Sequence, residues 1–214
     1  MTRKLVIFDF CDTISVGQTA SPFLSLVLKR TKMTWFLWEV LRRILRKIKV
    51  LEGARHKKFQ VLALSGVSKD DIDAVAEEFV LEHLKYHKKM KDKIEYYTNS
   101  DFDVFIVSGG FSEYIELFTR SIAGHVTVIA NSLQLREGRA TGKLSSIDCM
   151  GINKIELINQ CIDLKLYDLN SSCTYTDHVS DLPILLLVGN RYFVSSAVEP
   201  FWAPLFSVNV IPHD

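Results

Sequence analysis

The chain opens with a short apolar run that ends at acidic side chains. Residues 5–8 read Leu-Val-Ile-Phe, and Asp9 and Asp12 follow almost directly. Buried parallel strands are continuous runs of β-branched and aromatic residues, and each delivers the loop after it to one edge of the sheet. The pattern therefore predicts a first strand over Lys4–Phe8 with carboxylates at its carboxyl end.

From Ser21 to about Lys93 the apolar positions instead recur every three or four residues, as on one face of a helix. These positions are Phe23, Leu26, Val27, Trp35, Leu37, Trp38, Leu41, Ile44, Leu45, Ile48, Ile72, Val75, Ala76, Phe79, Val80 and Leu84. Ser68 precedes two acids, Asp70 and Asp71, which is typical of a helix N-cap and first turn. The segment is predicted to be an all-helical insert.

After Asp101, predicted strands and helices alternate. The predicted strands cover residues 104–107, 126–130, 173–176 and 192–194, and the predicted helices begin at Ser112, at Asn153 and near Asp181. Such alternation is typical of a doubly wound parallel sheet, in which ligands bind beyond the carboxyl ends of the strands. We therefore predict an α/β fold, a Rossmann-like doubly wound parallel sheet with an all-helical insert after strand one.

Composition restricts the class of protein. With 214 residues, 48% of them hydrophobic, the chain can bury the core of one domain and a modest insertion. A net charge of +1 gives no electrostatic reason to expect a nucleic acid partner. The spacing of Cys11, Cys149, Cys161 and Cys173 matches neither a CxxC pair nor a metal finger, which favours reduced thiols in a cytoplasmic protein. We expect neither an export signal nor a membrane-spanning helix, and the oligomeric state stays open.

Segment 29–58 is strongly basic, although the chain as a whole is nearly neutral. Eleven Lys or Arg residues against Glu39 and Glu52 give it a net charge of +9, which leaves −8 for the rest of the chain. Its apolar residues interleave with the basic ones. Three interpretations are open: a helix with its apolar stripe inside and its charges in water, a helix lying on an anionic membrane surface, or an electrostatic funnel for an anionic substrate such as a lipid or sugar phosphate.

Two strand ends carry groups that suit phosphate chemistry. Asp9 could be a metal ligand or a nucleophile toward phosphorus, or simply a loop acid that ends a strand. Ser108 and Gly109 follow the predicted strand at 104–107, where a hydroxyl and open backbone N–H groups can cradle phosphate oxygens. The alternative for this second motif is an ordinary Gly-rich turn into a helix.

Two further positions add charge. Lys154 stands at a predicted helix start, where anions are favoured, so either it meets a ligand or it is an ordinary surface lysine. Asp177 and Asp181 lie four residues apart around a turn, and carboxylate oxygens suit Mg²⁺. Asp181 could instead cap its helix, and His178 between them is more often a structural or exposed histidine.

Together, and in this order at these strand ends, the motifs resemble the haloacid dehalogenase superfamily, in particular its phosphoserine-phosphatase-like branch. The resemblance spans nearly the whole chain. It includes residues 131–133, a glycine-containing hairpin at 138–144 and residues 188–190.

For the fold, the resemblance implies a Rossmann-like core of residues 1–13 and 89–214. It also implies a helical cap of residues 14–88 that closes over the substrate and excludes water.

For the chemistry, the resemblance implies a phosphatase that hydrolyses a small phosphomonoester through an aspartyl phosphate on Asp9. Thr13, Ser108 and the Gly109 backbone would hold the phosphoryl oxygens, and Lys154 would neutralise charge. A carboxylate can approach an anionic phosphate only if cations offset their repulsion.

The cofactor implied by the resemblance is Mg²⁺. The Asp9 carboxylate, the backbone carbonyl of Cys11 and Asp177 would hold it, with Asp181 in support.

The sequence departs from the family pattern at two positions. The family usually has a second aspartate, a general acid, where this chain has Cys11, so Cys11 or Asp12 takes over proton transfer, or the protein is a phosphotransferase or a non-hydrolysing binding or regulatory module. Gln18 replaces the glutamate that meets the phosphoserine amine, which disfavours phosphoserine and leaves other small phosphomonoesters open. A receiver domain phosphorylated on aspartate ranks last, because it does not explain the helical insert.

Overall fold

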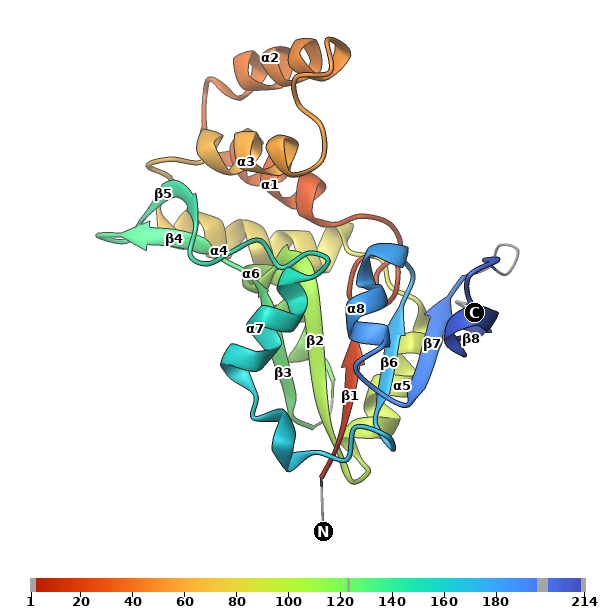
Figure 1. Ribbon diagram of the computed structural model, residues 1–214. Coiled ribbons are helices and arrows are strands. Elements are labelled where there is room, and N and C mark those ends of the chain that lie inside the picture. Colours follow the sequence, from red (N-terminus) through yellow and green to blue (C-terminus); the bar gives the residue numbers. More distant parts are fainter. Residues whose placement is uncertain (1–2, 123, 196–199, 213–214) are drawn as a thin grey trace.

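The computed structural model describes residues 3–122, 124–195 and 200–212, which form a parallel sheet with helices on both faces and a helical projection above it (Figure 1). The sheet strands are β1 (Lys4–Phe8), β2 (Phe102–Phe111), β3 (Val126–Asn131), β6 (Cys173–Thr176), β7 (Asn190–Val194) and β8 (Asn209–Ile211). Their order is β3-β2-β1-β6-β7-β8, and every pair is parallel. The chain thus winds outward from β1 in both directions, which confirms the predicted doubly wound fold.

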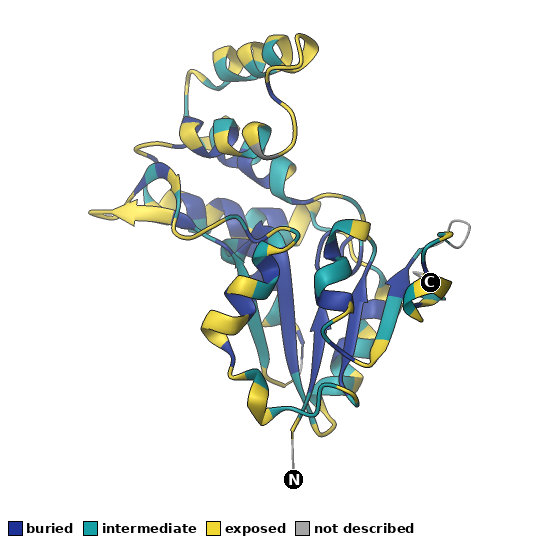
Figure 2. Ribbon diagram, viewed as in Figure 1, coloured by how far each residue is buried: buried dark blue, intermediate teal, exposed yellow. Residues whose placement is uncertain are grey.

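Both faces of the sheet are covered, and this explains the unbroken apolar run of β1. The core helices are α5 (Lys88–Thr98), α6 (Ser112–Thr119), α7 (Asn153–Cys161) and α8 (Leu182–Leu185). Val6 and Phe8 belong to the cluster under α5 and α6, whereas Leu5 and Ile7 belong to the cluster under α7 and α8. All four are fully buried, as expected for a central parallel strand and as the dark strands of Figure 2 show. Short 3-10 turns, η2 (Leu164–Leu166), η3 (Val179–Asp181) and η4 (Pro204–Phe206), join these elements.

The predicted helical insert is confirmed. Between β1 and α5 lie α1 (Ala20–Thr31), α2 (Trp35–Lys47), α3 (Ala54–Ala63), α4 (Lys69–Glu78) and the π-helical turn η1 (Phe79–His83). Ser68 caps α4 as predicted, because its hydroxyl accepts a hydrogen bond from the Asp71 N–H at 3.2 Å. Of the helices in the described part of the chain, none combines the length and apolar character needed to cross a membrane.

A hairpin joins the insert to the core. It consists of β4 (Leu133–Arg136) and β5 (Arg139–Leu144), and its tip at Glu137 and Gly138 has positive φ at both residues, as a tight two-residue turn requires. Backbone N–H groups of Gly66 and Ala140 donate to the carbonyls of Ala140 and Val67 at 2.7 and 2.8 Å. The hairpin therefore pairs with the loop between α3 and α4 and holds it above the sheet.

Two strands of the sheet differ from the sequence prediction. The strand predicted at 104–107 continues to Phe111, so Ser108 and Gly109 lie inside the end of β2, where its register against β3 shifts, and not in a loop after it. The three-residue strand β8 was missed, because so short an edge strand carries little periodic signal.

The structure contradicts one of the three interpretations left open for segment 29–58. This interpretation placed the apolar stripe of helix α2 inside and its charges in water, and it is wrong for much of the stripe. Leu37, Leu41, Ile44 and Ile48 are exposed, whereas Arg42 on the opposite side is only partly accessible.

Candidate active site

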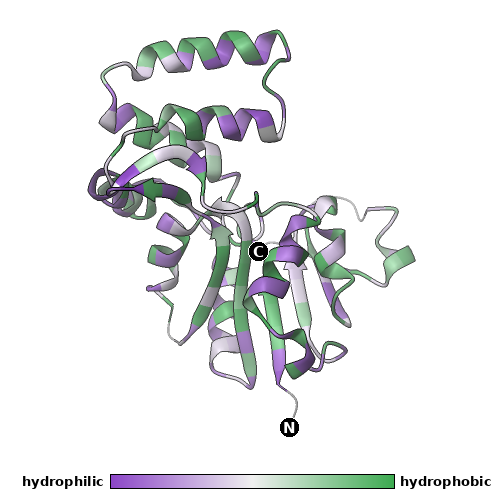
Figure 3. Cartoon of the chain, turned by 60° about the vertical axis from the view of Figure 1, so that its left-hand side comes forward, coloured by the Kyte–Doolittle hydropathy of each residue, from purple (hydrophilic) through white to green (hydrophobic). Residues whose placement is uncertain are grey.

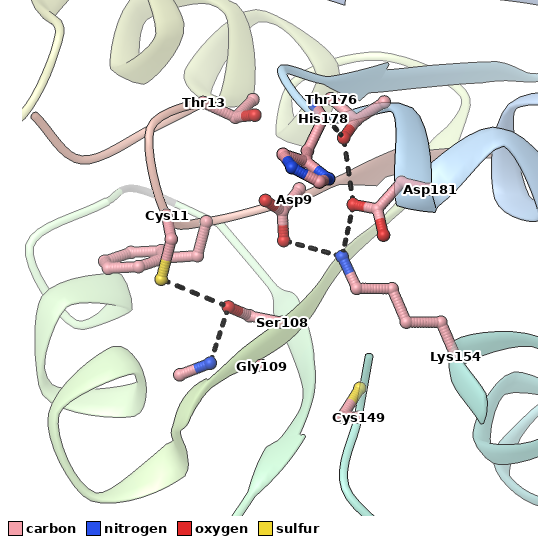
Figure 4. A network of polar contacts seen from close by, with 12 residues as sticks. Asp9, Cys11, Thr13, Ser108, Gly109, Cys149, Lys154, Thr176, His178 and Asp181 are labelled. Carbon is pink, nitrogen blue, oxygen red and sulfur yellow. Dashed lines mark hydrogen bonds and ion pairs between the residues drawn. The ribbon is translucent and has the colours of Figure 1, made fainter. Parts of the chain in front are cut away.

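Residues far apart in the sequence meet at the carboxyl edge of the sheet, below the cap helices. Asp9 follows β1 and keeps the strand pairing for one more residue, since its N–H donates to the Tyr175 carbonyl of β6 at 2.9 Å. Asp9 after β1 and Asp181 in the turn after β6 both meet the Lys154 side chain, and Ser108 at the end of β2 lies beside Cys11 (Figure 4). Only 6% of Asp9 is exposed, so it is a buried carboxylate and not a solvated loop acid.

Lys154 connects two of these carboxylates. From the first turn of α7 its Nζ donates to Asp9 Oδ1 at 2.7 Å and to Asp181 Oδ2 at 2.6 Å, and only 3% of the residue is exposed. The Thr176 hydroxyl donates to the same Asp181 oxygen at 2.9 Å. The structure therefore excludes the alternative of a surface lysine and gives Asp181 a partner beyond its own helix.

Burial and charge act in opposite directions on this triad. Desolvation raises the pKa of Asp9 to about 7, although the positive charge of Lys154 opposes the shift. Desolvation lowers the pKa of Lys154, but the attraction of Asp9 and Asp181 outweighs it, so the net pKa lies above the ordinary value. Lys154 is consequently a fixed positive charge beside Asp9 at neutral pH.

A cavity of about 230 Å³ opens beside the triad. The sequence-predicted residues that line it are Asp9, Cys11, Gln18, Gly109, Lys154, Asp177 and Asp181. Gly109 has to be small, because an added Cβ would lie 2.9 Å from Met150 Cγ. Because Gly109 has no side chain, the β2 backbone itself lines the cavity, as is needed if its N–H groups are to bind phosphate oxygens.

Two of the predicted phosphate ligands are buried beside the cavity. The Ser108 hydroxyl accepts a hydrogen bond from the Gly110 N–H at 3.0 Å, which holds it at the end of β2. The Thr13 hydroxyl donates to Asp177 Oδ1 at 3.0 Å. In this structure Thr13 thus orients a carboxylate.

The oxygen donors at this edge fit a hard divalent cation such as Mg²⁺. Asp9 and Asp177 line one cavity, and desolvation raises the pKa of Asp177 to about 6 although the Thr13 hydrogen bond opposes the shift. Asp9 and Asp181 both pair with Lys154, and Asp177 lines the same cavity as a third acid. A second cation would offset the remaining negative charge with ligands of the type that Mg²⁺ prefers.

The Cys11 thiol contacts neutral hydroxyl groups. Its Sγ lies 3.0 Å from the Thr19 hydroxyl and 3.9 Å from the Ser108 hydroxyl, and Thr19 in turn bonds the Tyr114 hydroxyl at 2.6 Å. Burial, followed by the nearby charge of Asp9, raises the pKa of the thiol. At neutral pH Cys11 is therefore protonated, so it can donate a proton but is a poor base.

The other candidates lie at the rim. The Gln18 amide donates to Asp12 Oδ2 at 3.0 Å, so the alternative proton donor Asp12 is tied to Gln18. His178 caps η3, because its Nδ1 accepts from the Ser180 N–H at 3.1 Å. This agrees with the structural role considered for that histidine.

Sequence reasoning missed a charged cavity residue from the helical insert, Lys57. Lys57 of α3 donates to the Gly109 carbonyl at 3.0 Å and to Asp148 Oδ1 at 2.6 Å. The Asn131 amide donates to the same two acceptors, each at 2.9 Å. Lys57 was counted in the basic segment, but nothing in its local sequence distinguishes it from the neighbouring lysines.

A second cavity, of about 590 Å³, lies within the cap and shares Gln18 with the first. Its wall combines apolar side chains such as Leu26 and Phe79 with basic ones such as Lys29 and Arg42.

Solved structures share this fold. A protein of unknown function from Bordetella pertussis Tohama I matches with a TM-score of 0.80 and 19% identity over 100% of both chains. A phosphoserine phosphatase, solved as a phospho-aspartyl intermediate analogue, matches with a TM-score of 0.65 and 14% identity over 100% of this chain and 95% of its own. Cytosolic 5'-nucleotidase IIIB, bound to cytidine, matches with a TM-score of 0.68 and 15% identity over 99% of this chain and 81% of its own. At these identities the matches show the fold.

The family is shown by the sequence itself. No curated protein matches the chain at a significant level. The model of the haloacid dehalogenase-like hydrolases, however, matches residues 6–186, which include every candidate site residue described above. The chain belongs to the haloacid dehalogenase-like hydrolase family.

Proposed function

We propose that this protein is a Mg²⁺-dependent phosphatase that hydrolyses a small phosphomonoester through an aspartyl phosphate on Asp9. The observation that carries the proposal is the buried ion-pair triad of Asp9, Lys154 and Asp181 beside a cavity at the carboxyl edge of the sheet. Membership of a hydrolase family supports it. A buried carboxylate next to a fixed positive charge is suited to attack an anionic phosphate.

The triad supports one oxygen of Asp9 as the attacking atom. Lys154 binds Oδ1 of Asp9, so the second oxygen, which points away from Lys154 in Figure 4, forms the bond to phosphorus. The bond between phosphorus and the ester oxygen then breaks, and the leaving oxygen takes up a proton, which the protonated Cys11 thiol in the cavity wall would supply. Water subsequently attacks the phosphorus and gives a proton to the thiolate left on Cys11, the bond between phosphorus and Asp9 breaks, and inorganic phosphate leaves with Asp9 and the thiol restored.

Asp9, Asp177 and the carbonyl of Cys11 would hold Mg²⁺, with Asp181 supporting them through Lys154. When bound, Mg²⁺ supplies positive charge that offsets the charge of the phosphoryl oxygens. Thr13 orients Asp177 for this role through its 3.0 Å hydrogen bond.

We further propose that residues 14–88 act as a cap on a core of residues 1–13 and 89–214. Lys57 supports this division, because it reaches from α3 to the Gly109 carbonyl and so brings the insert onto the phosphate cradle. The substrate is a small phosphomonoester other than phosphoserine, since Gln18 brings no charge to the rim.

A reducing compartment, the cytoplasm, suits this protein. The cysteines are free thiols, and three of the four are buried.

Cys11 also supports a second candidate, a phosphotransferase or a non-hydrolysing binding or regulatory module. Residue 11 is a cysteine and not a carboxylate that could activate water, so the aspartyl phosphate could persist or pass to another acceptor instead of being hydrolysed.

The test is hydrolysis of p-nitrophenyl phosphate with Mg²⁺ and with EDTA, beside a trap for phosphoenzyme. The variants are Asp9→Asn and, as a matched control on an exposed acid away from the cavity, Asp101→Asn. Metal-dependent turnover that Asp9→Asn abolishes and Asp101→Asn retains would support the phosphatase. A stable phosphoenzyme without turnover would favour the transferase. Neither product across a panel of phosphomonoesters would refute the phosphatase and the transferase and favour the binding module.

A further inference from the structure

Helix α2 presents an apolar face to solvent at the end of the molecule farthest from the sheet (Figure 1). The structure describes all of α2, and none of its residues is buried. The exposed apolar side chains of α2 and its C-terminal end are Phe36, Leu37, Val40, Leu41, Ile44 and Ile48. Leu37 is 65% and Ile44 53% exposed, which is more than cap packing would leave.

These side chains form one continuous surface. Positions 37, 41, 44 and 48 are separated by four, three and four residues, so they lie along one side of the helix. We call these four residues the outward face of α2. Figure 3 shows the hydrophobic residues along this helix.

The opposite side of α2 contacts the rest of the cap. The Trp38 ring packs on Phe59 with centroids 5.3 Å apart, and Arg42 bonds His56 at 3.0 Å. Arg42 also pairs with Glu39, and both line the larger cavity. The helix therefore turns a mixed aromatic and ionic side inward and its purely aliphatic side outward, the reverse of an amphipathic helix in water. Exposed apolar surfaces rimmed by polar residues mark interaction sites.

Charge indicates the kind of partner. Lys47 and Arg43 lie on the flank of α2 next to the outward face, Lys49 follows Ile48 at its end, and all three are exposed. They belong to segment 29–58, whose net charge is +9. A partner that covers this face has to be apolar where the aliphatic residues enter and anionic around them.

A second copy of the chain does not meet this requirement. An isologous contact between two outward faces would bring the exposed Arg43 and Lys47 side chains of two copies close together. Like charges across an interface oppose association. The surface of an anionic bilayer does meet it, because its acyl layer takes aliphatic side chains and its headgroups take Lys and Arg.

We propose that α2 docks this protein on an anionic membrane surface, with the outward face in the boundary between headgroups and acyl chains. The bordering Arg and Lys side chains contact lipid phosphates and carboxylates. The helix lies in the plane of the surface. The inference concerns binding alone and holds whether or not the protein is a phosphatase.

The test is flotation of the full chain with vesicles of phosphatidylcholine alone and of phosphatidylcholine mixed with phosphatidylserine. Wild type is expected to float with the anionic vesicles and to stay behind with the neutral ones. Leu37→Glu/Ile44→Glu places two negative charges on the outward face and should weaken partitioning by more than about tenfold. Leu81→Glu/Leu205→Glu makes the same chemical change at two other exposed leucines and should bind like wild type.

Circular dichroism of the variants checks that both pairs fold, and sedimentation velocity determines the oligomeric state without lipid. Absence of wild-type binding to anionic vesicles, or equal binding by the Leu37→Glu/Ile44→Glu variant, would overturn the proposal. A wild-type dimer that this variant converts to a monomer would also overturn it, because the outward face would then be an interface between copies.

Discussion

Replacing Lys154 by methionine tests the charge balance of the active site. Methionine is of similar length and apolar, so the change removes the cation but leaves a side chain that can fill the space. The two carboxylates that Lys154 bridges, Asp9 and Asp181, would then face each other in a site that is almost closed to water. We therefore expect the variant to keep the fold but to lose much of its stability.

The magnitude follows from the geometry. The bridged oxygens of Asp9 and Asp181 lie at most about 5.3 Å apart, so at an effective dielectric constant of about 20 their repulsion is at least about 3 kcal/mol. Removing one partner of a buried ion pair typically costs about 3–5 kcal/mol. We therefore expect the free energy of unfolding to fall by about 3–5 kcal/mol at pH values near 8, within the usual cost for such pairs.

The loss should depend on pH with a defined sign. Burial already holds the pKa of Asp9 at about 7, above its ordinary value of 3.8, and removing Lys154 raises the pKa further. Between the unfolded and the folded pKa, the native variant binds more protons than the unfolded chain, so its stability falls as pH rises. The loss relative to wild type should therefore be smaller near pH 5, where Asp9 is protonated.

The measurement is urea unfolding followed by tryptophan fluorescence at both pH values. Lys165→Met, at an exposed lysine, is the matched control and should change stability by less than about 0.5 kcal/mol. The double variant Lys154→Met/Asp181→Asn removes one of the facing charges and should recover part of the loss. A loss below about 1 kcal/mol at alkaline pH, or one independent of pH, would refute the argument that Lys154 balances two buried charges.

Two further predictions concern the same edge of the sheet, and a third concerns the accessibility of the cysteines. Cys11→Asp should raise phosphatase turnover by about 10²–10⁴-fold in steady-state assays, whereas Cys11→Ser should not; an unchanged rate would mean that another group transfers the proton. Affinity for Mg²⁺, measured by calorimetry, should fall as pH drops below 7, because protons compete for Asp9 and Asp177, whose pKa values are about 7 and 6. A flat profile would contradict this. At pH 8, iodoacetamide should label the exposed Cys161 in the native protein and leave the three buried cysteines unmodified, as mass spectrometry can show.

The sheet and its functional edge were predictable because both depend on local patterns. Leu5 to Phe8 are apolar at every position, since successive side chains enter different cores, and only a strand buried on both faces reads this way. Parallel strands bring their carboxyl ends to one edge, so the sequence placed Asp9 and Asp177 at the same edge, whereas their joint role came only from the family resemblance. The burial of Lys154 follows less directly, because its partner Asp181 lies on another element.

Contacts that depend on how the cap sits on the core could not be predicted in this way. Lys57 meets Gly109 and Asp148 across 52 and 91 positions of sequence, and its neighbours Arg55 and Lys58 have the same local character. The hydrogen bond from Thr13 to Asp177 likewise joins residues 164 positions apart. A pattern can indicate that a hydroxyl lies at a strand end, but it cannot indicate which acceptor the hydroxyl finds there.

Helix α2 shows the limit of periodicity most clearly. A spacing of three and four residues predicts that a helix has two faces, but the face that turns inward depends on the partners that the rest of the chain offers. Here those partners are Phe59, which takes the Trp38 ring, and His56, which takes Arg42, so the aliphatic residues are left outside. The charge of +9 on segment 29–58 is the sequence signal that agrees with this orientation. The proposed anionic bilayer would meet both features at once, because its headgroups would pair with the exposed basic side chains and its acyl layer would take the uncovered apolar face.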